Sequence, residues 1–354
     1  MFRRALVVKL RHHGDVLLSA PVFSALVAAQ PGIEVDALVY EETRDMLDLH
    51  PHVARVHAIP RDWRRLGVLA QLKRYWRLYR ELKARQYDLI VHLTDHWHGA
   101  RLARLLRPRV SVGPAGTKHS AFANRLWNRS FSALFPVPPG NQRHTVEMHL
   151  DALRAIGVRV VDTKLAFHPG AQAADSVAKR LAGRDFILVH PTSRWMFKAW
   201  PAASMAELVN ALIARGERIV LSAAPSAEER AYIAELKPRL RGDYLDLTGK
   251  LTLKELGALV AAARLLIGVD SMPVHLASAV GTPVVVLFGP SGDVEWAPWG
   301  VPHRIVTAPL PCRPCGNKGC GDGGVSDCLT AIAPAQVLGA VDALLAEVRR
   351  EVRT

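Results

Sequence analysis

Asp15 is the first residue whose type and position could do chemistry. It follows the apolar run Ala5–Leu10 and a single glycine, Gly14, and it precedes Val16–Ala29, whose apolar residues recur at helical intervals. An aspartate there could cap the helix, or it could lie at the carboxyl end of a strand and act as a general base on a substrate hydroxyl. The sequence leaves both interpretations open. With one glycine only, the turn lacks the dinucleotide-binding fingerprint, which disfavours a nicotinamide-dependent oxidoreductase.

A second candidate segment, Pro191–Pro201, follows the apolar strand expected at Phe186–His190. Thr192 and Ser193 supply hydroxyl groups, and Lys198 supplies a positive charge. A loop at the carboxyl end of a strand can hold a diphosphate, and a lysine there would neutralise charge that develops on a leaving group. The alternative is an ordinary surface loop that leads into the next helix.

A third candidate segment, Asp270–His275, follows the apolar run Leu265–Val269 and opens a helix. Backbone N–H groups and the positive end of the helix dipole suit a phosphate at such a position, and the Ser271 hydroxyl could donate to it as well. The alternative makes Asp270 a helix N-cap and His275 a core residue with satisfied hydrogen bonds.

Strand-like and helical segments alternate along the chain, and the pattern restarts near residue 186. This alternation is typical of parallel β-α-β units. We therefore expect an α/β protein of two Rossmann-like, doubly wound domains, residues 1–165 and 166–354, facing a central cleft at the carboxyl ends of their strands. Residues 157–184 are expected to form a linker, and the final helix, Ala335–Val348, belongs to the second domain or packs back on the first. The expected strands are Ala5–Leu10, Ile33–Val39, Val53–Ile59, Tyr87–Leu93, Phe186–His190, Arg218–Ser222, Leu265–Val269 and Val284–Phe288.

The three candidate segments together resemble a known family. Gly14-Asp15-Val16-Leu17-Leu18 with Pro21, Lys198-Ala199-Trp200-Pro201, and Asp270-Ser271 with His275-Leu276-Ala277 resemble the ADP-heptose:lipopolysaccharide heptosyltransferases, glycosyltransferase family 9. The segments 12–18 and 39–47 look most like the heptosyltransferase III branch. The resemblance implies a GT-B fold whose first domain binds the acceptor and whose second binds the nucleotide sugar. It also implies an inverting, metal-independent transfer of L-glycero-D-manno-heptose from ADP-heptose to the inner core of lipopolysaccharide.

The resemblance implies roles for individual residues as well. Asp15 matches the catalytic base, and Lys198 matches the lysine on the diphosphate. The donor-binding positions match Thr192, Ser193, Asp270, Ser271 and His275, and a ribose-binding glutamate is expected at Glu228, with Glu229 as the neighbouring candidate. Met272 and Pro273 stand where a glycine often follows the Asp-Ser pair. The sequence contains no Asp-x-Asp cluster of the kind that metal-dependent glycosyltransferases use, so no cofactor is expected for catalysis.

Positive charge is concentrated in the first half of the chain. The sequence has 46 Lys and Arg against 32 Asp and Glu, net +14, and residues 1–165 carry 26 basic and 14 acidic side chains, net +12. An excess of this size implies an anionic partner. No nucleic-acid-binding module accompanies it. The expected partners are therefore a lipopolysaccharide inner core and an anionic membrane surface, and no nucleic acid.

The segment Arg61–Arg85 holds nine of these cations against Asp62 and Glu81, with apolar residues interleaved at roughly helical spacing. The simpler interpretation is an amphipathic helix packed on the first sheet with a solvated basic face. The added interpretation is a face drawn to anionic lipid or to an acidic acceptor. The candidate acceptor-binding residues are Arg61, Arg64 and Arg65, with Lys118 and His144 as weaker ones.

Four cysteines lie close together in the sequence: Cys312, Cys315, Cys320 and Cys328. In a reducing compartment such a cluster suggests a metal before it suggests disulfides, and four thiolates could hold a structural zinc. The wide spacing of the second pair departs from a standard zinc knuckle. Reduced thiols in a loop are the alternative.

No signal peptide or membrane span is expected, because charged residues interrupt the apolar run after Met1 and the longest uncharged stretch, Ser271–Gly292, contains turn residues. We expect a cytoplasmic protein, peripheral on the inner face of the inner membrane. Two other functions fit the same residues. One is a related GT-B glycosyltransferase with another nucleotide sugar, and the other is a non-catalytic sugar-nucleotide- or lipopolysaccharide-binding protein.

Overall fold

The structure, a computed structural model, describes residues 1–62, 67–116, 120–181, 185–321 and 323–351. The chain divides into two compact units. The first comprises Met1–Pro139 and Arg143–Ala166, and the second comprises Gly140–Gln142 and Phe167–Thr354.

The short excursion of Gly140–Gln142 into the second unit is not part of the sequence prediction. Asn141 explains this excursion, because both the nitrogen and the oxygen of its side-chain amide form hydrogen bonds with residues of the second unit. Its Nδ2 donates a hydrogen bond to Asp293 at 2.7 Å, and its Oδ1 accepts from the backbone N–H groups of Val294 and Glu295.

A six-stranded parallel sheet forms the centre of the first unit, in the order β3-β2-β1-β4-β5-β6. Its strands are β1 (Arg4–Val8), β2 (Glu34–Tyr40), β3 (Arg55–Ile59), β4 (Leu89–His92), β5 (Val110–Pro114) and β6 (Ala133–Phe135). The central strands are almost continuously apolar and buried, as expected of parallel strands covered on both faces. The strand order reverses between β1 and β4, and ligands of such sheets bind beyond the carboxyl ends of the strands at this switch point.

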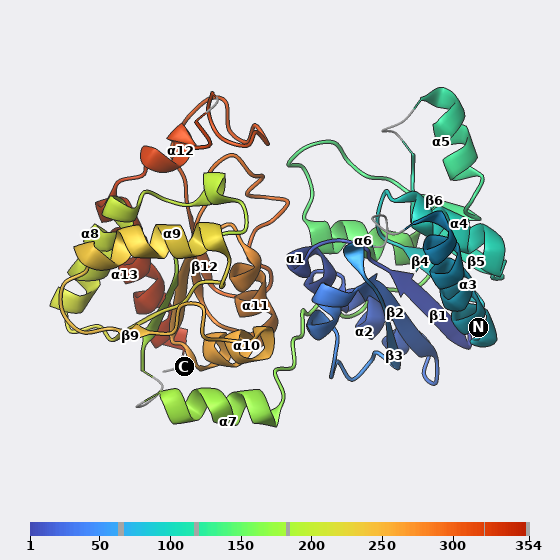
Figure 1. The fold of residues 1–354 in the computed structure, drawn as a ribbon, viewed down its shortest axis with the longest axis horizontal. Helices are drawn as coiled ribbons and strands as arrows, with labels where there is room; N and C mark the ends of the chain where they lie inside the picture. The colour runs from blue at the N-terminus through green and yellow to red at the C-terminus, as the bar shows by residue number, and fades with distance from the viewer. Residues whose placement is uncertain (63–66, 117–119, 182–184, 322, 352–354) are drawn as a thin grey trace. The chain divides into compact units, whose positions relative to one another are not determined.

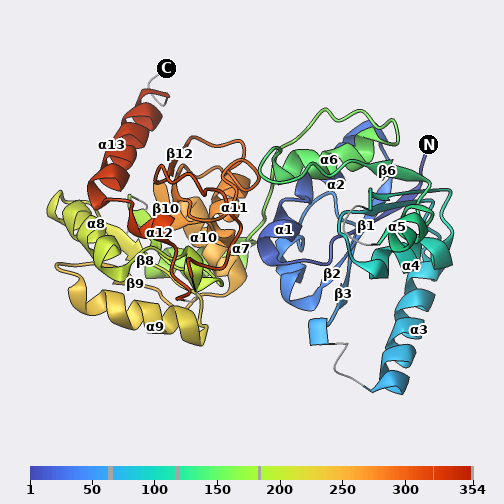
Figure 2. The same cartoon turned by 90° about the horizontal axis from the view of Figure 1, so that it is seen from above.

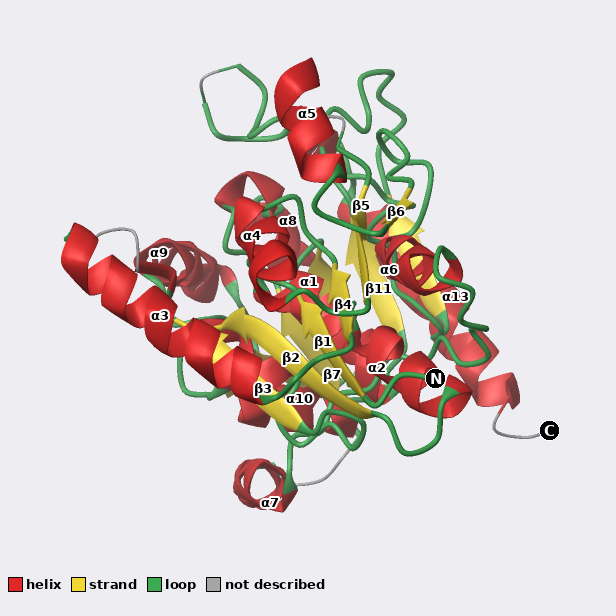
Figure 3. Ribbon diagram, turned by 90° about the vertical axis from the view of Figure 1, so that its right-hand side faces the viewer, coloured by secondary structure: helices red, strands yellow, loops and turns green. Residues whose placement is uncertain are grey.

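Helices flank this sheet (Figures 1 and 3). They are α1 (His13–Leu17), α2 (Ala20–Ala29), α3 (Val68–Ala84), α4 (Trp97–Leu106), α5 (Ala121–Asn128) and α6 (Thr145–Arg154), with a 3-10 helix at Glu41–Met46. The single helix predicted for Val16–Ala29 is wrong, because the chain breaks at Leu18 and Ser19. Pro21 has no N–H to donate to the carbonyl four residues back, and Ser19 Oγ donates to the Val16 carbonyl instead.

The second unit repeats this architecture with a six-stranded parallel sheet in the order β12-β11-β10-β7-β8-β9. Its strands are β7 (Ile187–His190), β8 (Ile219–Leu221), β9 (Leu245–Asp246), β10 (Leu265–Val269), β11 (Val284–Leu287) and β12 (His303–Val306). The switch point lies between β7 and β10, which pair directly. The predicted α/β fold with two doubly wound sheets is confirmed.

The helices of the second unit are α7 (Ala171–Arg180), α8 (Ala202–Ala214), α9 (Ala227–Leu236), α10 (Leu253–Ala262), α11 (Met272–Val280), α12 (Asp327–Thr330) and α13 (Pro334–Glu351). The segment 157–184, which the sequence predicts as a linker, contains the helix α7, and α7 packs on α10. Only Ala173 and Val177 of α7 are buried, so its apolar period is weak in the sequence. The final helix α13 packs on α8, β11 and β12, within the second unit.

No helix among the described residues has the length and apolar content that crossing a membrane requires.

Candidate active site

The switch point of the second sheet brings two of the three candidate segments together. β7 and β10 run side by side, with His190 opposite Gly268. Thr192 and Ser193 follow the end of β7, and Asp270 and Ser271 follow the end of β10. Segments that lie about 80 residues apart in the chain therefore meet at one sheet edge, where the fold class places ligands.

Lys198 reaches this edge from a short 3-10 helix at Met196–Lys198. Its Nζ donates a hydrogen bond to Asp270 Oδ2 at 2.6 Å. The 3-10 helix is held in turn by Ser326, whose Oγ donates to the Phe197 carbonyl at 2.6 Å. The Asp270 carboxylate is almost fully buried and Lys198 is about one-fifth exposed, so the ammonium faces the accessible side of the pair.

α11 begins immediately beyond this ion pair, with Ser271 as its N-cap residue. Ser271 Oγ donates back to the Val269 carbonyl at 3.1 Å, and no side chain caps the helix. Asp270 is therefore not the N-cap, which removes the simpler interpretation of that residue. In the first turn Pro273 has no N–H, and the Val274 N–H donates to the Ser271 carbonyl at 3.1 Å. The Met272 N–H and the positive end of the helix dipole lie beside Lys198 and Asp270, an arrangement that suits an anion.

His275 lies on the buried side of α11. The residue is 4% exposed, and its ring lies 6.3 Å from the ring of Trp296. This burial agrees with the interpretation of His275 as a core residue, and direct contact of His275 with a donor stays a prediction.

Of the two candidate glutamates, Glu229 lies beside this edge, and a ribose-binding role for either one stays a prediction. Glu228 is exposed in the first turn of α9, whereas Glu229 is buried and points back toward the sheet. Glu229 Oε2 accepts hydrogen bonds from Thr192 Oγ1 at 2.6 Å and from the Ala224 N–H at 2.9 Å. A one-residue shift turns a helix side chain by about 100°, which sequence alone did not resolve.

Thr192 and Ser193, predicted as donor-phosphate hydroxyls, are both buried. The Thr192 hydroxyl proton is used by Glu229. Ser193 Oγ accepts a hydrogen bond from the Trp195 N–H at 3.3 Å, which leaves its own proton to donate. Contact of either hydroxyl with a phosphate stays a prediction, and the geometry favours Ser193.

Asp15 lies in the first turn of α1, directly after the switch-point strand β1, and it does not cap that helix. The carboxylate is about one-fifth exposed, and its Oδ1 lies 3.7 Å from Lys9 Nζ. The Lys9 ammonium is buried and also donates to the Leu93 carbonyl at 3.1 Å, beyond the end of β4. The carboxylate is thus held beside a fixed cation and stays accessible, as a general base requires.

His149 of α6 completes this arrangement. Its Nδ1 lies 3.0 Å from the Leu18 carbonyl, which can only accept, so Nδ1 carries the proton and Nε2 accepts from Lys9 Nζ at 2.8 Å. Burial lowers the pKa of His149 well below its usual value. Burial likewise lowers the pKa of Lys9 to about 8, against the opposing effect of the Asp15 charge. A neutral imidazole therefore positions the cation beside Asp15.

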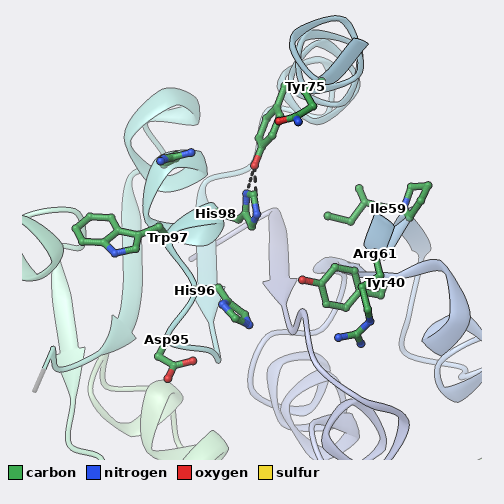
Figure 4. A pocket seen from close by; sticks show the side chains of 11 residues that line it. Tyr40, Ile59, Arg61, Tyr75, Asp95, His96, Trp97 and His98 are labelled. Atoms are coloured by element: carbon green, nitrogen blue, oxygen red, sulfur yellow. Dashed lines mark hydrogen bonds between the residues drawn. The ribbon is translucent and has the colours of Figure 1, made fainter. Parts of the chain in front are cut away.

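A pocket of about 420 Å³ lies at the carboxyl edge of the same sheet (Figure 4). Its walls come from the ends of β2 and β3, the segment after β4, and the helices α3 and α4. The lining residues are Tyr40, Ile59, Pro60, Arg61, Gln71, Tyr75, Asp95, His96, Trp97, His98 and Arg101. Aromatic walls with a few placed charges are typical of sites for polar small molecules.

The polar groups of this pocket are held in place by contacts with one another. The Tyr75 hydroxyl bonds to His98 Nδ1, and the Arg61 guanidinium lies 4.1 Å from the centre of the Tyr40 ring. Asp95 Oδ1 pairs with Arg11 at 2.5 Å. Arg101 is exposed and makes no ion pair with a described carboxylate, so its charge is available to an anionic ligand.

The acceptor-binding candidates have different outcomes. Arg61 lines the pocket and is anchored by Glu42 and by the Arg11 carbonyl. Arg64, Arg65 and Lys118 lie outside the described residues. His144 is buried as the N-cap of α6, where its Nδ1 accepts from the Val146 N–H at 3.1 Å, so it presents no surface to an acceptor.

Comparison with known proteins assigns this chain to a family. The family model of glycosyltransferase family 9 (heptosyltransferase) matches residues 75–325. The chain is 35% identical over 296 residues to lipopolysaccharide heptosyltransferase 3 of Escherichia coli, an alignment that covers 82% of this chain and 84% of the relative. The chain belongs to glycosyltransferase family 9.

Solved structures of similar fold agree with this assignment. E. coli ADP-heptose lps heptosyltransferase II superposes with a TM-score of 0.77 at 20% identity, over 98% of this chain and 99% of the other. E. coli heptosyltransferase WaaC with ADP gives 0.76 at 22% identity, over 96% and 99%. The predicted GT-B fold is confirmed, and the protein is a glycosyltransferase.

The four cysteines of this family 9 chain differ in exposure. Cys312, Cys315 and Cys320 are exposed, and Cys328 is buried. No three His, Cys, Asp or Glu side chains in the described part of the chain are arranged to hold a metal ion. Burial raises the pKa of the Cys328 thiol. A structural zinc at these cysteines stays a prediction.

Two groups of the site were missed by the sequence analysis: Lys9 with His149, and the pocket residues from Asp95 to Arg101. Lys9 did carry a signal, since it is the one charged residue in the apolar run Ala5–Leu10. His149 carried none, because its contact with Lys9 joins residues 140 positions apart.

Proposed function

We propose that this family 9 glycosyltransferase moves L-glycero-D-manno-heptose from ADP-heptose to the inner core of lipopolysaccharide, with inversion, as a heptosyltransferase III. The likeness to E. coli ADP-heptose lps heptosyltransferase II supports the donor, and the 35% identity to the E. coli heptosyltransferase 3 supports the branch. The observation that carries the proposal is the Lys198–Asp270 pair at the uncapped start of α11.

In the proposed reaction, an acceptor hydroxyl oxygen attacks the anomeric carbon of the donor from the face opposite the diphosphate. The bond between that carbon and the diphosphate oxygen breaks, its electron pair leaves with ADP, and the hydroxyl proton passes to the Asp15 carboxylate. The Lys198 ammonium and the Met272 N–H at the start of α11 stabilise the negative charge that develops on the leaving diphosphate. The proposal assigns this charge to protein groups, so the transfer needs no metal ion.

Other side chains of each unit have a part in this proposal. Lys9 places a positive charge beside the Asp15 carboxylate, and His149 fixes the position of Lys9. Glu229 is the proposed ribose-binding carboxylate, oriented by Thr192 and the Ala224 N–H. The pocket bounded by Tyr40, Tyr75 and Arg101 is the proposed site for an acidic sugar of the acceptor.

The proposed place of action is the cytoplasmic face of the inner membrane, where the chain associates peripherally with the lipid that carries its acceptor. The charge supports this part of the proposal, because the half that holds Asp15 has an excess of 12 positive charges, from 26 basic and 14 acidic side chains. Such a surface attracts both the phosphorylated acceptor and anionic lipid headgroups.

The test is turnover with defined truncated lipopolysaccharide cores that carry no, one or two heptoses. The proposal predicts ADP release from ADP-heptose with the diheptosyl acceptor only, a new glycosidic bond of inverted configuration, and undiminished turnover in a chelator. Release of ADP with none of the acceptors would overturn it, and so would efficient transfer from a different nucleotide sugar to the same core.

A further inference from the structure

The large apolar side chains of the helix α3 form two stripes, one buried and one exposed. The inner stripe consists of Tyr75, Leu78 and Leu82, whose spacing of three and four residues is that of one helix face. Leu78 and Leu82 are buried in the core of the first unit, and Tyr75 packs against that core. The inner stripe therefore accounts for the packing of α3 on the first sheet.

The outer stripe has no counterpart within the described structure. Leu69, Leu72 and Trp76 are again three and four residues apart, on the side of the helix opposite Leu78. They are 84%, 61% and 62% exposed, and Val68 beside them is 72% exposed. Figure 2 shows the start of α3 projecting away from the strands of its unit. A contiguous exposed stripe of large apolar side chains marks an interaction surface.

The charges around the outer stripe are all of one sign. Lys73, Arg74, Arg77 and Arg80 are exposed, and none of them pairs with a described carboxylate. The only acidic residue of α3 is Glu81, which is bound to His57 Nδ1 at 2.6 Å. The exposed surface of α3 is therefore apolar near its beginning and cationic along its flanks and end.

We propose that the outer face of α3, defined by Leu69, Leu72, Trp76 and the cations Lys73, Arg74, Arg77 and Arg80, docks the protein on an anionic lipid bilayer. A helix with an apolar stripe and a cationic flank lies in a membrane interface with its apolar side chains among the acyl chains and its cations at the headgroups. Aromatic residues such as Trp76 favour that depth. A bilayer accommodates a narrow stripe of this kind without the shape complementarity that a protein partner needs.

Docking through this face deepens the proposed function. Gln71 and Tyr75, on the inner side of the same helix, line the pocket proposed for the acceptor. Binding of α3 to lipid would bring this pocket to the surface from which a lipid-linked saccharide projects. This link to the acceptor rests on the proposed function, whereas the binding of lipid does not.

The test is co-sedimentation of the full chain with vesicles of phosphatidylglycerol and phosphatidylethanolamine, compared with vesicles of phosphatidylcholine. The proposal predicts binding to the anionic vesicles only, weakened by salt. The variant Leu69→Ser/Leu72→Ser/Trp76→Ser and the variant Arg74→Gln/Arg77→Gln/Arg80→Gln should each bind about tenfold more weakly, with thermal midpoints near that of the parent. Equal binding to phosphatidylcholine, no binding to anionic vesicles, or parental binding by both variants would overturn it.

Two matched controls locate the effect on α3. The variant Lys179→Gln/Arg230→Gln/Arg241→Gln removes the same charge from exposed positions of the second unit, and Phe122→Ser removes an exposed aromatic side chain from α5. Both should bind anionic vesicles like the parent, and a tenfold loss in either would contradict a role specific to α3. Quenching of tryptophan emission by brominated lipid should decrease in Trp76→Phe.

Turnover of a lipid-free core oligosaccharide separates this proposal from the proposed function. The α3 variants should retain it, because their replaced side chains do not line the pocket. If the parent bound anionic vesicles but transferred no heptose, the proposed function would fail and the lipid-binding proposal would stand.

Discussion

Lys198 Nζ and Asp270 Oδ2 lie 2.6 Å apart, although 72 residues separate them in the chain. The pairing of β7 with β10 makes this contact possible, because it places the segments after both strands at one switch point. The buried carboxylate fixes the ammonium beside the start of α11 before any ligand arrives. A diphosphate bound there would meet a preorganised cation, which costs little reorganisation in the reaction.

Replacement of this cation should slow the chemical step. For Lys198→Met we expect kcat for ADP-heptose turnover to fall by about 10² to 10³, the magnitude typical of losing one preorganised group that stabilises developing charge. Lys237→Met is the control, because Lys237 pairs with Asp246 at 2.5 Å in the same unit but away from the switch point. Equal activity of the two variants in steady-state assays would contradict the role of Lys198.

Arg101 should contribute to acceptor binding and little to the chemistry. Arg101 lines the pocket, and its guanidinium forms no ion pair with a carboxylate of the described residues. Because its charge can then pair with a phosphate of the acceptor, Arg101→Gln should raise KM for a phosphorylated acceptor about tenfold with kcat nearly unchanged. The increase should be smaller with a dephosphorylated acceptor. Arg104→Gln, one turn along α4, should leave KM unchanged because Arg104 donates to the Leu126 carbonyl and does not line the pocket. A change in kcat alone would argue against this assignment.

Three buried histidines should make the protein sensitive to acid. Burial lowers the pKa of His92 to about 3 and of His190 to about 4, and it lowers that of His149 well below its usual value. In the unfolded chain these histidines bind protons near pH 6.5, whereas in the folded chain they stay neutral to a much lower pH. Their contribution to the free energy of unfolding is therefore fully present above pH 6.5 and is lost as the pH decreases toward 4. The slope should reach about 1.4 kcal/mol per histidine for each pH unit. Urea unfolding at pH 7 and pH 5 measures it, and equal values would refute the account.

The cysteine loop can be tested by counting thiols and metal together. The exposure of Cys312, Cys315 and Cys320 and the burial of Cys328 predict three thiols that react quickly with a disulfide reagent and one that reacts only on unfolding. The same geometry predicts less than about a tenth of an equivalent of zinc after gentle purification. One equivalent of metal together with four protected thiols would instead establish the zinc site that the sequence suggested.

Much of the fold could be predicted from sequence because parallel strands that are buried on both faces are nearly continuous apolar runs. The runs before Asp15, Thr192 and Asp270 are of this kind, and the structure has β1, β7 and β10 there. Short edge strands such as β6 and β12 carry no such run and were not predicted. The helix α7 was missed because only two of its side chains are buried.

The candidate site was predictable only where sequence position determines the placement of a side chain. Residues directly after a strand of a parallel sheet must lie at its carboxyl edge, so Asp270 and Lys198 could be proposed together. Which glutamate of α9 turns inward depends on the rotation of that helix, and the sequence favoured Glu228 over Glu229. The contact of His149 with Lys9 depends on packing between α6 and the sheet, for which the local sequence holds no signal.

The central claim is that Asp15 takes the proton from the acceptor, and Asp15→Asn tests it most directly. The substitution keeps the size of the side chain and removes its basicity, so single-turnover transfer should fall by at least about 10² while the Kd for ADP-heptose stays within about twofold of the parent. Asp175→Asn, an exposed position on α7, should behave like the parent. Full transfer activity in Asp15→Asn would contradict the account.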